Sequence, residues 1–136
     1  MIRGIGVDLL HLERLHRLLL RRDPLHFARR ILSPRELADF DPSFNSSTAV
    51  NFLALRWTAK EAAYKALYPH AVVTWHDLDV SKRARDPKPR LAFSTTSRFA
   101  TDPVSQLLEM HLSVSHDAGF MTAYVVVEER ATSRPA

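Results

Sequence analysis

A change of hydrophobic period at Tyr68-Pro69 constrains the fold of this chain more than any other feature. Before this dipeptide, apolar residues recur every three to four positions, as in amphipathic helices, and after it they alternate with polar residues, as in half-buried strands. Residues 1–8 also alternate loosely, so a strand is expected to precede the helices. The order of one strand, several helices and then several strands favours an α+β domain with an antiparallel sheet packed on a long helix.

The helical part contains clear start and stop signals. Ser33-Pro34 followed by Glu36 predicts a capped short helix that ends near Asp41-Pro42. Further helices are expected over residues 11–20 and 27–30. The longest helix is expected over residues 49–67, with Ser46, Ser47 or Thr48 as its cap.

In the second half, strands are expected over residues 72–80, 90–93, 112–115 and 121–128, with a turn at 116–119 between the last two. A helix is expected over residues 104–110. Residues 130–136 are expected to form a frayed tail.

Length and composition limit the class of protein. The 136 residues favour one domain over residues 1–136, and the absence of cysteine excludes disulfides, thiolate metal sites and cysteine nucleophiles. No apolar stretch reaches the roughly 20 residues of a membrane span, and no targeting segment is expected. The predicted location is the cytoplasm or, because of the long polar insert over residues 94–103, the mitochondrial matrix. The net charge of +4 attracts polyanions in general without choosing among them.

The long helix is predicted to accept a close neighbour. Leu53, Trp57, Glu61 and Lys65 follow at intervals of four and line one face, and small alanines surround them. A strand can approach such a surface closely. Gly4 and Gly6, which lack the third glycine of a nucleotide-binding fingerprint, are expected to allow this close packing.

Two carboxylates are candidate metal ligands. Asp8 follows an apolar run at the expected end of the first strand, and Glu61 lies on the helix face described above. If strand and helix pack together, the two carboxylates converge, and Mg²⁺ commonly takes one or two carboxylates plus substrate phosphates. The alternative is that Asp8 caps the next helix and Glu61 pairs with Lys65 on the surface.

Polar residues at the end of a later strand do not form a catalytic triad. Ser115, His116 and Asp117 are contiguous, and adjacent strand residues point to opposite faces, so they cannot pass a proton along one line. His116, at the turn, is instead free to reach a phosphate or a water. Arg56 and Lys60 join Glu61 and Lys65 in a mixed-charge cluster, which Trp57 and Tyr64 place at the border of a core or an interface.

Three separated segments, in order, resemble the holo-acyl-carrier-protein synthase family of 4′-phosphopantetheinyl transferases. They are residues 4–8 (Gly-Ile-Gly-Val-Asp), residues 57–66 (Trp-Thr-Ala-Lys-Glu-Ala-Ala-Tyr-Lys-Ala) and residues 112–116 (Leu-Ser-Val-Ser-His). Residues 27–33, followed by Glu36, are also similar to a segment of that family. The resemblance spans nearly the whole chain.

The resemblance implies transfer of the phosphopantetheine arm of coenzyme A, a co-substrate, to a serine of an acyl carrier protein, with release of 3′,5′-ADP. It implies that Asp8 and Glu61 bind Mg²⁺ and that His116 lies near the diphosphate. Contacts to coenzyme A are implied for Arg56, Lys60, Lys65, Lys88, Pro89, Ser115 and His116. The resemblance further implies a homotrimer whose active sites are shared between protomers, and docking of an acidic carrier protein on Arg14, Arg21, Arg29 and Arg30.

Two departures from the family pattern alter segments near the expected nucleotide. Leu67-Tyr68-Pro69-His70 replaces glycines that follow the second motif, and Asp86-Pro87-Lys88-Pro89 stands where a Gly-Lys-Pro sequence is frequent.

Two other functions compete with the transferase. One is a small basic nucleic-acid-binding module, although no run of exposed aromatics or helix-turn-helix signature appears. The other is an inactive relative that serves as an interaction platform.

Overall fold

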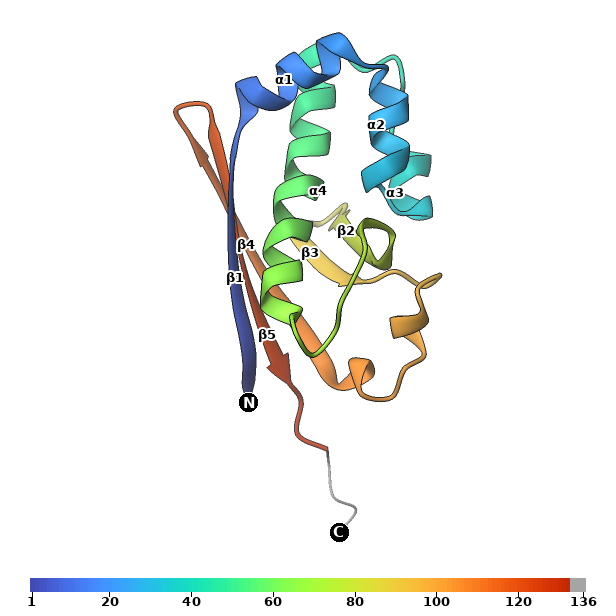
Figure 1. Ribbon diagram of the computed structural model, residues 1–136, viewed down its shortest axis with the longest axis vertical. Coiled ribbons are helices and arrows are strands. Elements are labelled where there is room, and N and C mark those ends of the chain that lie inside the picture. Colours follow the sequence, from blue (N-terminus) through green and yellow to red (C-terminus); the bar gives the residue numbers. More distant parts are fainter. Residues whose placement is uncertain (133–136) are drawn as a thin grey trace.

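The computed structural model describes residues 1–132 and has a three-stranded antiparallel sheet packed on one long helix, together with a separate two-stranded hairpin (Figure 1). The larger sheet has the order β1-β5-β4, and β2 pairs with β3 in a separate hairpin. The strands are β1 (Ile2–His11), β2 (Leu78–Arg83), β3 (Asp86–Phe93), β4 (Leu108–Asp117) and β5 (Phe120–Glu129). The helices are α1 (Leu12–Arg21), α2 (Pro24–Ile31), α3 (Pro34–Asp39) and α4 (Ser46–Leu67), with short 3₁₀ turns η1 (Trp75–Asp77), η2 (Arg98–Ala100) and η3 (Ser105–Leu107). The predicted α+β architecture, with an antiparallel sheet on a long helix, is confirmed.

Strand β1 lies directly on the backbone of α4. A Cβ placed on Gly4 would come within 1.9 Å of the carbonyl oxygen of Ala66, and one on Gly6 equally close to that of Ala62. Only glycine fits at such a distance, so the predicted use of these glycines and of the alanine face of α4 is confirmed. The even-numbered residues of β1 therefore face α4, and the odd-numbered ones face away from it.

Helices α2, α3 and α4 each begin where a side chain caps them. Ser33 and Glu36 form the predicted reciprocal cap of α3. The predicted start of α4 was three residues late, because Asn45 caps the helix by accepting a hydrogen bond from the backbone N–H of Thr48. The predicted end at residue 67 is confirmed.

Two predicted elements of the second half differ in the structure. Most of the predicted strand 72–80 is loop and 3₁₀ turn, because the Asp77 carboxylate accepts hydrogen bonds from the N–H and hydroxyl of Thr74 and closes a local turn. The predicted helix 104–110 is instead η3 and the start of β4. Leu108 and Met110 pair with Glu129 and Val127 of β5, so ladder hydrogen bonds replace the helix.

Two further predictions concern the C-terminal tail and membrane-spanning segments. Of the predicted frayed tail, residues 130–132 have no regular structure, and residues 133–136 lie outside the described part of the chain. Within residues 1–132, no helix is both long enough and apolar enough to cross a membrane.

Candidate active site

Asp8 lies in the middle of β1, not at the end of a strand, because pairing with β5 continues as far as His11. As an even-numbered residue it is on the α4 side, and its side chain is 15% exposed. The Lys65 Nζ lies 3.3 Å from the Asp8 Oδ1 and donates a 2.8 Å hydrogen bond to the carbonyl oxygen of Val7. The hydroxyl of Thr122 donates to the Asp8 carbonyl oxygen from the neighbouring strand. The carboxylate is thus held at the junction of sheet and helix.

Glu61 approaches this carboxylate from α4. The Glu61 side chain is partly buried, and burial raises its pKa above the usual range. The negative charge of Asp8 raises this pKa further, whereas the positive charge of Lys65 lowers it. The expected convergence of two carboxylates from residues 8 and 61 is therefore present. The alternative was wrong: α1 has no side-chain cap from Asp8, and the ion pair of Lys65 is with Asp8.

This pair has the chemistry of a magnesium site. In residues 1–132 no group of three or more histidine, aspartate or glutamate side chains gathers as a complete metal cage. Mg²⁺ does not require such a cage, because it commonly keeps several waters and takes its other ligands from substrate phosphates. Two mutually repelling carboxylates, with one cation beside them, fit that need, and Asp8 and Glu61 are the residues that would hold the ion.

A cavity of about 220 Å³ adjoins Glu61. Its walls are Lys60, Glu61 and Tyr64 of α4, and Val73, Thr74 and Trp75 of the following loop. Trp75 also packs against Trp57 of α4, with ring centroids 5.1 Å apart, and Trp57 stacks on Phe27 of α2 at 5.3 Å. The predicted position of Trp57, at the border of a core, is confirmed.

Lys60 is a structural residue, so its expected contact with coenzyme A is corrected. It is 2% exposed, and its three donors bind the Glu36 carboxylate and the carbonyl oxygens of Ile31 and Trp75. Burial lowers the pKa of this lysine, and the charge of Glu36 opposes that effect. An ammonium with three partners has no donor left for a phosphate.

The expected contact of Arg56 with coenzyme A is also corrected, because this side chain is buried and points into the core. Its guanidinium is largely buried, lies over the Phe52 ring and donates to the Phe52 carbonyl oxygen. Its Nε is 3.7 Å from a Glu36 carboxylate oxygen. The mixed-charge cluster of the sequence therefore divides into two parts: Arg56 and Lys60 point into the core, and Glu61 and Lys65 point toward the site.

Sequence reasoning predicted Glu36 as a capping residue but missed its buried ion pair with Lys60. Glu36 is 2% exposed and accepts hydrogen bonds from the backbone N–H groups of Ser33 and Val80 as well as from Lys60. Asp79, next to Val80, accepts from the Ser33 hydroxyl. This buried network joins α3, α4 and β2 and fixes the turn of α4 that carries Glu61. The only signal of Glu36 in the sequence was the capping box, which explains its two hydrogen bonds with Ser33 but not its ion pair with Lys60.

His116 is not brought to Asp8 within one chain. It lies near the end of β4, on the same side of the sheet as Asp8, but β5 runs between β4 and β1. Two strand spacings separate the strands by roughly 10 Å. Ser115 is exposed on the opposite face of β4, as the alternation predicted for adjacent residues.

Lys88 and Pro89 are also far from Asp8 in this chain. Both lie on β3, in the hairpin next to β4, whereas Asp8 lies on β1 at the other edge of the larger sheet, and Lys88 is exposed. Lys88 lines a broad groove of about 780 Å³ between β3 and β4, together with Arg83, Arg90 and Arg130. This groove is basic.

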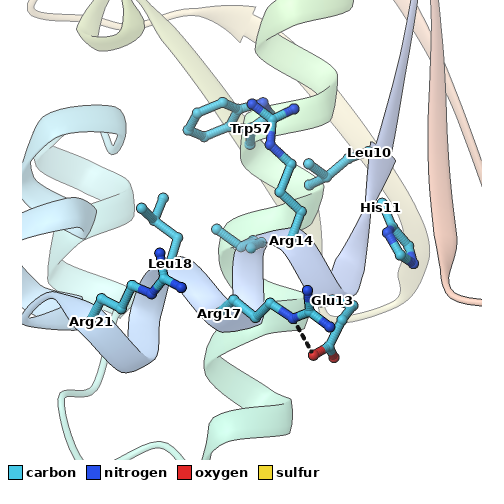
Figure 2. Close-up of a pocket in the computed structure, with 9 residues that line it drawn as sticks. Leu10, His11, Glu13, Arg14, Arg17, Leu18, Arg21 and Trp57 are labelled. Carbon is cyan, nitrogen blue, oxygen red and sulfur yellow. Dashed lines mark hydrogen bonds and ion pairs between the residues drawn. The ribbon is translucent and has the colours of Figure 1, made fainter.

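The arginines expected to dock a carrier protein lie on α1 and α2. Arg14 and Arg21 line a pocket of about 430 Å³ between α1 and α4, with Arg17, Leu18 and Trp57 (Figure 2). In Figure 2, Arg14 extends toward Trp57, and Arg17 pairs with Glu13. Arg29 and Arg30 are exposed on the last turn of α2. The pocket combines an apolar floor with a cationic rim.

This geometry agrees with comparisons to known proteins. The profile of the 4′-phosphopantetheinyl transferase superfamily matches residues 4–123. A holo-acyl-carrier-protein synthase of Vibrio cholerae is 40% identical over 134 residues, covering 96% of this chain and 100% of that protein. The crystal structure of the Neisseria meningitidis holo-acyl-carrier-protein synthase has a TM-score of 0.77 and 30% identity, covering 95% and 100% of the two chains. That of the Bacillus anthracis enzyme, in complex with coenzyme A (3′,5′-ADP), has a TM-score of 0.71 and 31% identity over 96% and 99%.

The chain therefore belongs to the 4′-phosphopantetheinyl transferase superfamily. Within it, the chain is an enzyme of the holo-acyl-carrier-protein synthase type, as the three motifs indicated. The nucleic-acid-binding module is set aside by this membership.

Proposed function

We propose that this protein transfers the 4′-phosphopantetheine arm of coenzyme A to a serine of an apo acyl carrier protein. The serine oxygen forms a bond to the phosphorus nearer the pantetheine, the bond from that phosphorus to the bridging oxygen breaks, and 3′,5′-ADP leaves. The observation that supports this most directly is the convergence of Asp8, Glu61 and Lys65 at one point of the β1–α4 junction. The relatives of that name and the coenzyme A complex of the Bacillus anthracis enzyme also support it.

The three side chains suit this reaction because it builds negative charge on a leaving diphosphate. Mg²⁺ bound by Asp8 and Glu61 would neutralise that charge and orient the phosphoryl group. Lys65 is half-exposed beside the pair, so its ammonium can contact a phosphate while it stays close to Asp8. The serine proton would pass to Glu61 or to a water beside the metal, the two acceptors that this arrangement offers.

We propose further that the active enzyme is a homotrimer. The outer face of the larger sheet leaves Ile5 and Leu9 of β1 and Tyr124 of β5 more than half exposed. Such an apolar face is typical of a surface that another subunit covers. In a trimer, His116, Ser115, Lys88 and Pro89 of one protomer would complete the nucleotide site of its neighbour, which accounts for their distance from Asp8 within a single chain.

The helical pocket would receive the carrier protein. Arg14 and Arg21 at its rim, and Arg29 and Arg30 on α2, present positive charge around an apolar floor. An acidic partner helix with a few apolar residues is complementary to that surface.

One experiment tests the reaction. The protein is incubated with an apo carrier protein, coenzyme A and Mg²⁺, and the carrier is read by intact mass, with a chelator in a parallel sample. The expected result is a phosphopantetheine adduct that the chelator abolishes, with 3′,5′-ADP as the second product. No adduct with several apo carrier proteins, together with retained binding of coenzyme A, would support the inactive interaction platform instead.

A further inference from the structure

The last two turns of α4 and Tyr68, the residue that caps its end, present four polar or aromatic side chains along one stripe. Glu61, Tyr64, Lys65 and Tyr68 follow at intervals of three and four, so they are neighbours on one helix face. The Tyr64 and Tyr68 rings stack on each other, with centroids 6.2 Å apart and an angle of 27° between the planes. The stripe thus runs from a carboxylate, past an ammonium, to an aromatic pair.

The aromatic pair is open to a ligand. Tyr64 is 40% exposed and Tyr68 is 57% exposed, and no hydrogen bond to either phenol oxygen is formed within the described residues. Tyr64 also lines the 220 Å³ cavity beside Glu61, whose far wall is Val73, Thr74 and Trp75. A flat group that entered beside Tyr64 would therefore meet an aromatic surface that is already ordered by stacking.

The distance along the helix indicates which group this is. Tyr68 lies seven residues beyond Glu61, which is roughly 10 Å along the axis. A nucleotide whose diphosphate lies at Glu61 and Lys65 must extend its sugar and base over a similar length. The direction toward Tyr68 is the one in which α4 offers exposed aromatic rings, and base–aromatic stacking is a general means of holding a base.

We propose that Tyr64 and Tyr68 form the subsite for the aromatic base of the nucleotide donor. This inference rests on the proposed function and deepens it, because it names residues that bind the nucleoside half of coenzyme A. Tyr68, which stands in place of a glycine of the family, thereby has a role in donor binding. The rings contribute binding energy and take no part in the transfer of the arm.

Binding measurements separate this subsite from the phosphate site. Adenosine 3′,5′-bisphosphate and the base-free ribose 3,5-bisphosphate are titrated, with Mg²⁺, into the wild type and into Tyr64→Ala and Tyr68→Ala. For the adenosine compound we expect a loss of affinity of roughly tenfold in each alanine variant, because this is about the effect of removing one base–aromatic stacking contact. For the base-free compound we expect no change. Tyr64→Phe and Tyr68→Phe, which keep the ring, should retain the affinity of the wild type.

Three results would overturn the inference. They are unchanged affinity for the adenosine compound in both alanine variants, equal losses for both compounds, and failure of the phenylalanine variants to restore binding. Both tyrosines lie outside the core, so the fold should persist, and a thermal unfolding midpoint for each variant checks this. Failure of the wild type to transfer the arm would refute the proposed function instead, because nucleotide affinity is measured without a carrier protein.

Discussion

The ammonium of Lys65 lies 3.3 Å from the carboxylate of Asp8, although 57 positions separate them in the sequence. The same ammonium donates to the backbone of Val7, so one side chain fastens β1 to α4 at the point where Glu61 also approaches. The site therefore consists of groups that the fold has already ordered before any substrate binds.

Removal of either carboxylate should abolish transfer while leaving the fold intact. Asp8→Asn and Glu61→Gln keep the shape of the side chain and remove the charge that would bind the metal. We expect the rate of arm transfer to fall at least about a hundredfold, since metal stabilisation of the transition state contributes several kcal/mol. Intact mass of the carrier protein measures this, with circular dichroism as the check on folding. Turnover near that of the wild type in either variant would refute the metal assignment.

The raised pKa of Glu61 predicts a pH-dependent cost to stability. A carboxyl whose pKa is higher in the folded state stabilises the fold below its usual pKa, and this contribution is lost as pH rises through the raised pKa. Without metal, Glu61→Gln should therefore gain thermal stability relative to the wild type as pH increases from the acidic range to neutrality. Melting curves across that range test the sign. A difference that shrinks with rising pH would contradict it.

Breaking the buried pair of Glu36 and Lys60 should destabilise the whole domain. Lys60→Met removes the closest counter-charge of a buried carboxylate and leaves it to two backbone N–H groups and the more distant Arg56, and breaking a buried pair costs about 3–5 kcal/mol, so a loss at the lower end of that range is expected. Adding Glu36→Gln to the same chain should recover part of the loss, since the stranded charge is gone. Urea unfolding of the wild type, both single variants and the double variant gives the coupling energy. Additive losses would show that the two groups act independently.

Gly6→Ala should be among the most damaging single substitutions in the chain. Its Cβ would lie 1.9 Å from a backbone oxygen of α4, so the strand must move off the helix. The expected loss is at or above the upper end of the ~1–3 kcal/mol typical of overpacking. Gly119→Ala is the matched control: its Cβ would make only an ordinary contact with the His11 ring at 3.9 Å, and its φ of +79° is strained, so about 1–2 kcal/mol is expected. Chemical denaturation should rank them in that order, and the reverse order would show that β1 can shift without cost.

Charge reversal on the helical surface should weaken carrier binding selectively. Arg14→Glu and Arg30→Glu are expected to raise the KM for the carrier protein several-fold, with the KM for coenzyme A nearly unchanged. The effect should shrink as salt increases, because exposed charges are screened. Arg85→Glu, an exposed arginine at the tip of the β2–β3 hairpin, is the control of equal charge change. Equal effects of the three variants would mean that net charge alone is responsible.

The sequence predicted the parts of the fold that depend on local pattern. The capping residues Ser33 and Glu36, the end of α4 at Leu67 and the packing role of Gly4 and Gly6 follow from signals within a few residues. The two carboxylates were predicted because strand and helix each present one face, and facing surfaces bring their polar residues together.

Other parts depend on partners distant in the chain. Lys60 resembles a surface lysine by its neighbours, and only the approach of Glu36, Ile31 and Trp75 buries it. Strand β4 begins at Leu108 because β5 supplies its ladder, which no local propensity reveals. Most of the strand predicted at residues 72–80 does not form, and here the cause is local: the Asp77 side chain accepts a hydrogen bond from the Thr74 backbone and closes a turn.

The alternation of β1 has a consequence for how this protein can change over evolutionary time. Gly6 and Asp8 point toward the helix, and Ile5, Val7 and Leu9 point outward. Insertion or deletion of a single residue between Gly4 and Asp8 would exchange these two sets, burying aliphatic side chains against the alanines and turning the carboxylate out to solvent. Only insertions or deletions of an even number of residues in this short stretch therefore keep both sets on their own faces. The segment before Gly4 is not subject to this restriction.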